Sequence, residues 1–230
     1  MLEVTDVSKS FKKEKILDHV SFRVETGEIA GIIGRNGSGK TVLFKIVCGF
    51  YTADAGSVSI DGKYLGKDME VPENIGSIIE TPGFLNSYPA YRNLKFLADI
   101  RGVAKKEEIL RAIRTVGLDP ANRKKVGKYS LGMRQRLGLA QAIMEDPDIL
   151  VLDEPMNGLD NKGVEDMRQL LLGLKEQGKT ILLASHNRED IEVLCDKVYE
   201  MDHGVLTEKK DERAFVAPQD YLNSEYHVEF

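Results

Sequence analysis

The sequence has few cysteines, no excess of basic residues and no long hydrophobic run. Its two cysteines, Cys48 and Cys195, lie far apart and belong to no CxxC pair. This usage favours a reducing, cytosolic setting over a disulfide framework. Lysine and arginine total 32 against 37 aspartate and glutamate residues, a net charge of -5. Because an acidic chain without a basic stripe is poorly suited to wrapping nucleic acid, we expect no nucleic-acid partner.

Membrane-spanning and secretory segments are also lacking. No stretch approaches the roughly 18 uninterrupted apolar residues that a transmembrane helix needs. The first residues, MLEVTDVSKSFKKE, contain no apolar signal segment. We therefore expect a soluble, cytoplasmic protein that would need a partner for any work at a membrane. The 230 residues, 42% of them hydrophobic, suit one large α/β domain or one domain with an inserted lobe.

Hydrophobic periodicity divides the chain into a strand-rich front, a helical middle and a β–α–β back. Strands are expected at 2–8, 19–28, 28–33, 56–65 and 74–80, and at 148–152, 180–184 and 198–209. Tight turns are expected at Asp61-Gly62 and His203-Gly204. Helices are expected at 92–117, 131–146 and 162–177. The runs at 148–152 and 180–184 are almost continuously apolar, which is typical of a parallel sheet covered on both faces.

The stretch GRNGSGKT, residues 34–41, fits the pattern G-x-x-x-x-G-K-[ST]. Gly37 and Gly39 let the backbone curl so that consecutive N–H groups form a nest for anionic oxygens. Lys40 adds a positive charge for the outer phosphates, and Thr41 offers a hydroxyl to a magnesium ion. A helix that begins at about Lys40 would aim the positive end of its dipole at the same spot. We therefore predict a nucleotide phosphate site. Its expected residues are Gly34, Arg35, Asn36, Gly37, Ser38, Gly39, Lys40, Thr41 and Val42.

Two adjacent carboxylates, Asp153 and Glu154, end the apolar run of DILVLDEP (148–155). Ligands of open α/β sheets gather at the carboxyl ends of strands, so both side chains would lie beside the phosphate loop. Asp153 would hold magnesium, as in other P-loop nucleotidases, and Glu154 would orient and polarise the attacking water. Without the phosphate loop, the pair could equally be polar residues that cap a strand.

A third segment, YSLGMRQRLGLA (129–140), starts a predicted helix just upstream of these carboxylates. Ser130 is a good N-cap for a helix that runs onward from Leu131. With the small Gly132 beside it, this helix N-terminus is a candidate anion site. An ordinary capped helix is the commoner case, and only the place of the segment in the chain favours the anion site.

In order the chain shows GRNGSGKT, NIGSIIE, YSLGMRQR, ILVLDEP, NGLD and LLASHN. This ordered set resembles the nucleotide-binding domain of the ATP-binding cassette (ABC) family, over roughly residues 1–208. The resemblance implies an α/β fold: a P-loop NTPase core with a parallel sheet, an N-terminal antiparallel β subdomain and an inserted α-helical subdomain at about 86–145. It leaves 209–230 as a C-terminal tail with no assigned role.

The resemblance also implies roles for residues that would be unremarkable alone. Phe11 matches the aromatic residue that stacks on adenine, and His186 matches the switch histidine that senses the γ-phosphate. Asp160 in NGLD matches the loop that crosses to the neighbouring subunit. Ser130 and Gly132 match the signature that contacts the ATP held by the partner domain. The implied catalytic residues are Lys40, Glu154 and His186, and the implied Mg²⁺ ligands are Thr41, Glu80 and Asp153.

Three positions depart from the usual family pattern. Glu80 stands where the family usually has a glutamine that touches magnesium or its water and communicates with the membrane subunit. Its added negative charge should change metal affinity and pH dependence. The signature reads YSLGM in place of LSGGQ, and Val42 stands where a second hydroxyl often assists the α-phosphate. A cassette with this glutamate and signature is similar to the bacterial lantibiotic-immunity and bacitracin-resistance exporter ATPases.

The implied function is an ATPase subunit, peripheral at the inner face of the cell membrane, that energises a separate permease exporting antimicrobial peptides or similar compounds. Two chains, identical or paralogous, would face head to tail, each bringing its signature to the ATP of the other. Two alternatives stay open here: a cassette ATPase acting outside transport, and a nucleotide switch that does not hydrolyse. The compact helical insert and single cassette disfavour the first, and Glu154 with His186 disfavours the second.

Overall fold

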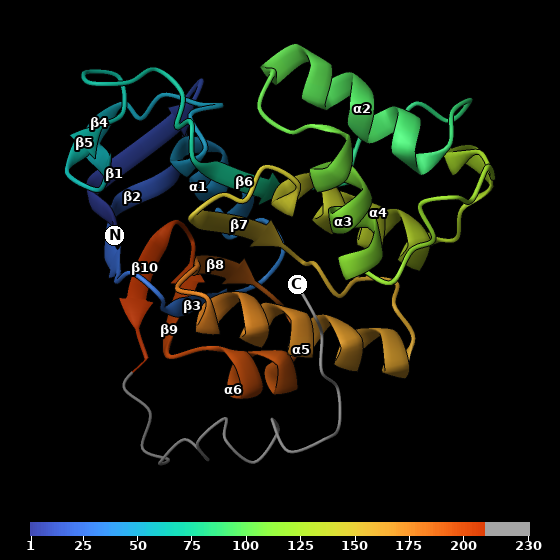
Figure 1. The fold of residues 1–230 in the computed structure, drawn as a ribbon. Coiled ribbons are helices and arrows are strands. Elements are labelled where there is room, and N and C mark those ends of the chain that lie inside the picture. The colour runs from blue at the N-terminus through green and yellow to red at the C-terminus, as the bar shows by residue number, and fades with distance from the viewer. Residues whose placement is uncertain (210–230) are drawn as a thin grey trace.

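The computed structural model describes residues 1–209, which form two β-sheets and a set of helices (Figure 1). The predicted tail at 209–230 lies outside the described residues, apart from its first residue. The α/β fold expected from the sequence is confirmed: a parallel sheet with flanking helices is joined to an antiparallel N-terminal sheet.

The N-terminal sheet is antiparallel and has the strand order β2-β1-β4-β5. Its strands are β1 (Leu2–Phe11), β2 (Glu14–Val24), β4 (Ala55–Ile60) and β5 (Lys63–Tyr64). The turn between β4 and β5 falls at Asp61 and Gly62, as predicted, with φ values of 49° and 77°. Positive φ at both central residues is the geometry that a two-residue hairpin turn requires.

The second sheet has the order β10-β9-β3-β8-β7-β6, in which only β10 runs antiparallel to its neighbour. Its strands are β3 (Ile29–Ile33), β6 (Ile75–Ile78), β7 (Ile149–Asp153), β8 (Thr180–Ala184), β9 (Lys197–Asp202) and β10 (Val205–Glu208). The two apolar runs of the sequence are β7 and β8, which lie inside the sheet and are buried along their whole lengths. The carboxyl ends of β3, β6, β7 and β8 therefore share one edge.

The side chains of this sheet alternate between two hydrophobic cores, as the period of a strand requires. Ile149 and Val151 of β7 pack with helix α1 (Lys40–Val47) and the N-terminal sheet. Leu150 and Leu152 pack into the core formed with the remaining helices. Each such side chain contributes about 1.5–3 kcal/mol when fully buried. Figure 1 shows helices α5 and α6 on the opposite side of the sheet from α1.

The helices differ from the prediction in several places. The stretch expected to be helical over 92–117 forms two helices, because Gly102 ends the first with a left-handed φ of 70°. A short helix after His186 was not predicted. The remaining helices are α2 (Ala90–Arg101), α3 (Lys106–Thr115), the 3₁₀ turn η1 (Val126–Lys128), α4 (Leu131–Ile143), α5 (Asn161–Glu176) and α6 (Arg188–Leu194).

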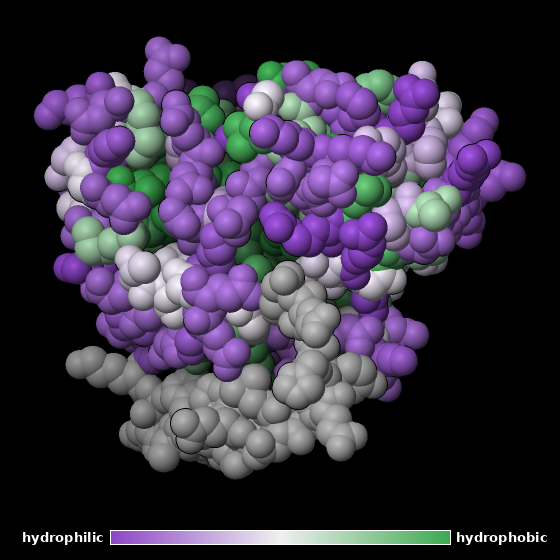
Figure 2. All heavy atoms as spheres, viewed as in Figure 1, coloured by the Kyte–Doolittle hydropathy of each residue, from purple (hydrophilic) through white to green (hydrophobic). Residues whose placement is uncertain are grey.

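The face seen in Figure 2 is mainly hydrophilic. Hydrophobic residues are scattered over it, and several lie between the N-terminal sheet and α2. Within residues 1–209, no helix is long and apolar enough to cross a membrane. Both cysteines are free and buried, with exposed fractions of 4% for Cys48 and 3% for Cys195. Burial raises the pKa of the Cys48 thiol to about 12 and raises that of Cys195 as well.

Candidate nucleotide-binding site

A cavity of about 640 Å³ opens at the carboxyl edge of the parallel sheet. It brings together segments that lie far apart in the sequence: the phosphate loop after β3, Glu80 after β6, and the two carboxylates at the end of β7. The lining residues are Glu14, Ile16, Asn36, Gly37, Gly39, Lys40, Thr41, Val42, Glu80, Thr81, Pro82, Leu131, Arg134, Gln135, Asp153, Glu154 and Asn157. Most of the predicted site residues therefore share one cavity.

The phosphate loop is curled as the glycine pattern predicts. Gly39 caps helix α1 with a φ of 116°, and a Cβ there would lie 2.9 Å from the Leu17 side chain, so only glycine fits. The Lys40 ammonium donates hydrogen bonds to the carbonyl oxygens of Gly34 and Arg35, at 2.7 and 3.0 Å. The Ser38 hydroxyl is buried and has no hydrogen-bond partner within residues 1–209. This loop has an unpartnered hydroxyl and surrounds a lysine ammonium, and both features suit the binding of an anionic phosphate.

Thr41 and Asp153 meet in the same cavity. The Thr41 hydroxyl donates a 2.8 Å hydrogen bond to Oδ2 of Asp153. Burial raises the pKa of the Asp153 carboxyl, and the Thr41 bond opposes that rise. In the described part of the chain, no three histidine, cysteine, aspartate or glutamate side chains converge on a metal site. Mg²⁺ typically takes one or two protein oxygens and completes its shell with phosphate and water. Thr41 and Asp153 fit that requirement and are the residues that would hold it.

Glu154 and His186 form the next pair along the sheet edge. Glu154 adopts a left-handed φ of 52° directly after β7, and its N–H donates to the Ala184 carbonyl at the end of β8. This turn brings its Oε2 to 2.7 Å from Nδ1 of His186. A left-handed φ is rare outside glycine and concentrates at functional sites. No local pattern pointed to Gln135, whose side-chain amide donates to the Glu154 carbonyl at 3.1 Å.

Glu80 is paired with a residue that the sequence reasoning missed. Its Oε1 accepts a 2.7 Å hydrogen bond from the ammonium of Lys45 in helix α1. That bond is the largest cause of a raised Lys45 pKa, with burial acting in the opposite direction. Helical spacing could have revealed the residue, because Lys45 lies four positions after Thr41 and so on the same helix face. The role of Glu80 toward a metal stays a prediction.

Ser130, Gly132 and Asp160 line a different cavity, of about 690 Å³. Ser130 caps α4 by accepting from the Met133 N–H at 3.2 Å, and Asp160 caps α5 by accepting from the Gly163 N–H at 2.9 Å. The three predicted residues thus lie together but do not line the cavity that holds Lys40. Helix α4 reaches that first cavity through Leu131, Arg134 and Gln135.

Two further predicted residues are Phe11, which lies at the margin of the site, and Val42, which lines it. Phe11 ends β1 and is 41% exposed, with its ring edge-on to Tyr51 at a centroid distance of 5.5 Å. It does not line the cavity, although Glu14 and Ile16 of the next strand do. Val42 lines the cavity without offering a hydroxyl. The adenine-stacking role of Phe11 remains a prediction.

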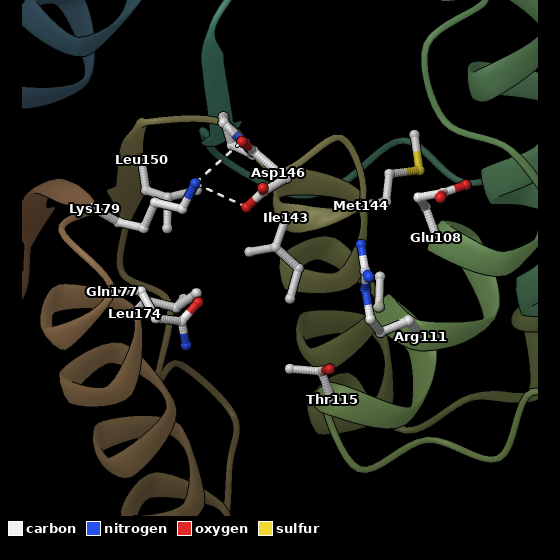
Figure 3. A pocket seen from close by; sticks show the side chains of 12 residues that line it. Glu108, Arg111, Thr115, Ile143, Met144, Asp146, Leu150, Leu174, Gln177 and Lys179 are labelled. Atoms are coloured by element: carbon white, nitrogen blue, oxygen red, sulfur yellow. Dashed lines mark hydrogen bonds and ion pairs between the residues drawn. The ribbon is translucent and has the colours of Figure 1, made fainter. Parts of the chain in front are cut away.

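A third hollow, of about 300 Å³, lies between α3, the end of α4 and the end of α5 (Figure 3). Its clearest polar contact joins the Lys179 ammonium to Asp146, at 2.8 Å from the carboxylate and 3.1 Å from the backbone carbonyl. Its lining contains none of the predicted site residues. The candidate chemistry therefore belongs to the cavity at the carboxyl edge of the sheet.

Comparison with known proteins places the chain among cassette proteins. The family model described as "ABC transporter" matches residues 17–157. The uncharacterised ABC transporter ATP-binding protein YybJ of Bacillus subtilis is 47% identical, over 90% of this chain and 94% of its own length. The bacitracin transport ATP-binding protein BcrA of Bacillus licheniformis is 41% identical, over 91% and 69%. The lantibiotic transport ATP-binding protein SrtF of Streptococcus pyogenes is 34% identical, over 92% and 91%.

Solved structures share the fold. The dimeric structure of MJ0796, described as a bacterial ABC transporter cassette, matches with a TM-score of 0.84. It covers 94% of this chain and 100% of its own, at 22% sequence identity. At that identity the likeness establishes the architecture, namely a parallel sheet with its helical insert.

Proposed function

Because the chain belongs to the ABC transporter family, we propose that it binds and hydrolyses ATP and thereby energises a separate membrane permease. The observation that carries the proposal is the shared cavity in which the phosphate loop meets Asp153 and Glu154. A phosphate-binding loop alone would serve many nucleotide-binding proteins. The added carboxylate of Glu154, 2.7 Å from His186, would supply the general base that favours hydrolysis over binding alone.

The residues divide the chemistry between them. Backbone N–H groups of the curled loop and the Lys40 ammonium would hold the phosphates. Thr41 and Asp153 would hold Mg²⁺, which when bound supplies positive charge to the phosphate oxygens. Glu154 would accept a proton from the attacking water, and His186 would keep that carboxylate in place through its 2.7 Å contact. The reaction class is phosphoryl transfer to water.

A second copy of a cassette would complete the site. In one chain, Ser130, Gly132 and Asp160 line a cavity separate from that of Lys40. Two chains facing head to tail would let each supply this surface to the nucleotide of the other. The dimeric form described for the cassette MJ0796, which has the same fold, supports this arrangement. Nucleotide would then join the two chains, and hydrolysis would release them.

We propose that the permease would contact the loop that follows Glu80. Leu85 and Tyr88 in this loop are 52% and 40% exposed, so apolar surface is available there to a partner. The transport names of BcrA and SrtF support export of an antimicrobial peptide or a similar compound. Attachment to such a permease would hold the chain at the inner face of the cell membrane.

Replacing Lys40 by alanine should weaken ATP binding about 10- to 100-fold, because a charge-assisted contact to phosphate is worth roughly 1.5–3 kcal/mol. ATP affinity of the purified chain, measured by displacement of a fluorescent nucleotide, tests this. Lys106→Ala, which removes an exposed lysine at the start of α3, is the matched control and should bind as the wild type does. Unchanged affinity in the Lys40 variant would remove the phosphate site from the proposal.

Affinity capture of the tagged chain from detergent-solubilised membranes tests the transport part. We expect a polypeptide with about six hydrophobic helices, each long enough to span a bilayer, to be recovered with it. Replacing Leu85 and Tyr88 by serine should reduce that recovery without changing ATP affinity. Recovery of the chain from the soluble fraction alone, without any such polypeptide, would favour a cassette ATPase that acts outside transport.

A further inference from the structure

The ion pair between Lys45 and Glu80 ties helix α1 to the segment that follows β6. The 2.7 Å contact joins helix α1 to a loop 35 residues further along the chain. Glu80 holds a left-handed φ of 60°, a conformation that a glutamate rarely adopts without outside support. The Lys45 side chain is only 20% exposed, whereas that of Glu80 is 62% exposed. The lysine is therefore the fixed partner and the glutamate is the one that it holds.

Lys45 also contacts the aromatic pair at the margin of the cavity. Its ammonium lies 5.5 Å from the centroid of the Tyr51 ring, and its carbonyl accepts a 3.2 Å hydrogen bond from the Tyr51 N–H. The Tyr51 ring in turn packs edge-on against Phe11. Lys45 is thus fixed on two sides, which makes it a rigid support for Glu80.

The excess of negative charge in the cavity explains why the Lys45–Glu80 pair matters for nucleotide binding. Four carboxylates line the cavity, against the two cations Lys40 and Arg134. These carboxylates belong to Glu14, Glu80, Asp153 and Glu154. A polyphosphate entering this excess of negative charge would be repelled unless some of it is cancelled. Lys45 lies directly behind Glu80 and cancels its charge.

We propose that Lys45 is a positioning residue for Glu80: it holds the carboxylate against helix α1 and neutralises it, so that the nucleotide meets a neutral pair. The inference rests on the proposed function, since it concerns the same nucleotide site. Lys45 and Glu80 should behave as one unit, and changing either should alter the effect of changing the other.

A double-mutant cycle tests this with Lys45→Met, Glu80→Gln and the double variant. ATP affinity is measured in EDTA, so that no metal contributes. Lys45→Met should weaken ATP binding about two- to fivefold, because it releases an unpaired carboxylate toward the phosphates. In the Glu80→Gln background the same change should cost less than about twofold. Lys45→Arg should keep near-normal affinity. Equal effects of Lys45→Met in both backgrounds would overturn the positioning role, since the lysine would then act through its own charge alone.

Amide hydrogen exchange of residues 79–85 in the nucleotide-free chain supplies a second readout. Exchange should become faster in Lys45→Met and stay unchanged in Lys45→Arg. Lys95→Met is the control, because it removes an exposed 2.7 Å pair with Asp99 on helix α2. Unchanged exchange in Lys45→Met would overturn the inference while leaving the proposed function standing. If the wild-type chain binds no ATP but exchange is still faster in Lys45→Met, the proposed function fails while the role of Lys45 in holding the Glu80 segment stands.

Discussion

Replacing Glu154 by glutamine should lower ATP turnover by about two to four orders of magnitude, the usual worth of a general base. The amide has the size of the carboxylate but cannot take a proton from water. The left-handed turn that carries Glu154 is fixed by its backbone bond to Ala184 and by the Gln135 amide, so the local fold should persist. Phosphate release at saturating ATP measures the effect.

The same variant should also change the oligomeric state. Since ATP would bind but not be consumed, nucleotide-joined pairs of chains should accumulate and appear as dimers in size-exclusion chromatography with ATP and Mg²⁺. Glu192→Gln makes the identical chemical change in an exposed glutamate that is paired with Arg188, and it should leave both turnover and oligomeric state unchanged. Near-normal turnover in Glu154→Gln would show that another group activates the water.

Replacing Arg168 by methionine should lower the free energy of unfolding by about 3–5 kcal/mol, because it leaves a buried carboxylate without its counter-charge. Arg168 of α5 contacts Oδ1 of Asp190 through Nε and Nη2, at 2.9 and 2.6 Å. Asp190 is 1% exposed, and its second oxygen accepts from the Ser185 hydroxyl at 3.1 Å. A typical domain is stable by only 5–15 kcal/mol in all, so the loss is large. Urea unfolding followed by circular dichroism measures it.

Two companion variants separate this buried pair from ordinary surface charge. Arg188→Met breaks an exposed pair with Glu192 and should cost no more than about 1 kcal/mol. Combining Arg168→Met with Asp190→Asn removes both charges, keeps the contact with Ser185, and should recover much of the lost stability. If the double variant is as unstable as Arg168→Met alone, packing of the arginine side chain is the cause, not the stranded charge.

Much of the fold could be predicted because the decisive signals are local. The runs at 148–152 and 180–184 are almost continuously apolar, as expected for strands of a sheet covered on both faces, and every residue of β7 and β8 is buried. The turns at Asp61-Gly62 and His203-Gly204 carry residues that tolerate positive φ, and the structure has positive φ at all four. Helix α6 escaped prediction because seven residues give no periodicity, although Asn187 accepts from the Glu189 N–H and so caps it.

Part of the candidate site could also be predicted from the sequence, because some of its signals are local. The phosphate loop and the Asp153-Glu154 pair are each contiguous, so their patterns are visible in one stretch. The contact between Lys45 and Glu80 joins residues 35 positions apart, and that between Gln135 and Glu154 joins residues 19 apart. Such contacts depend on how helices dock on the sheet edge. No local pattern in one sequence specifies that docking.

The burial of both cysteines makes the native chain ready for site-directed chemistry. Thiol reagents attack the thiolate, and a buried thiol whose pKa is raised to about 12, as at Cys48, forms almost none at neutral pH. Cys195 is equally enclosed. A cysteine introduced at an exposed position would thus be the one that reacts with a spin label, a fluorophore or a bifunctional cross-linker. The distance between two copies could then be followed through a nucleotide cycle without first removing either natural thiol.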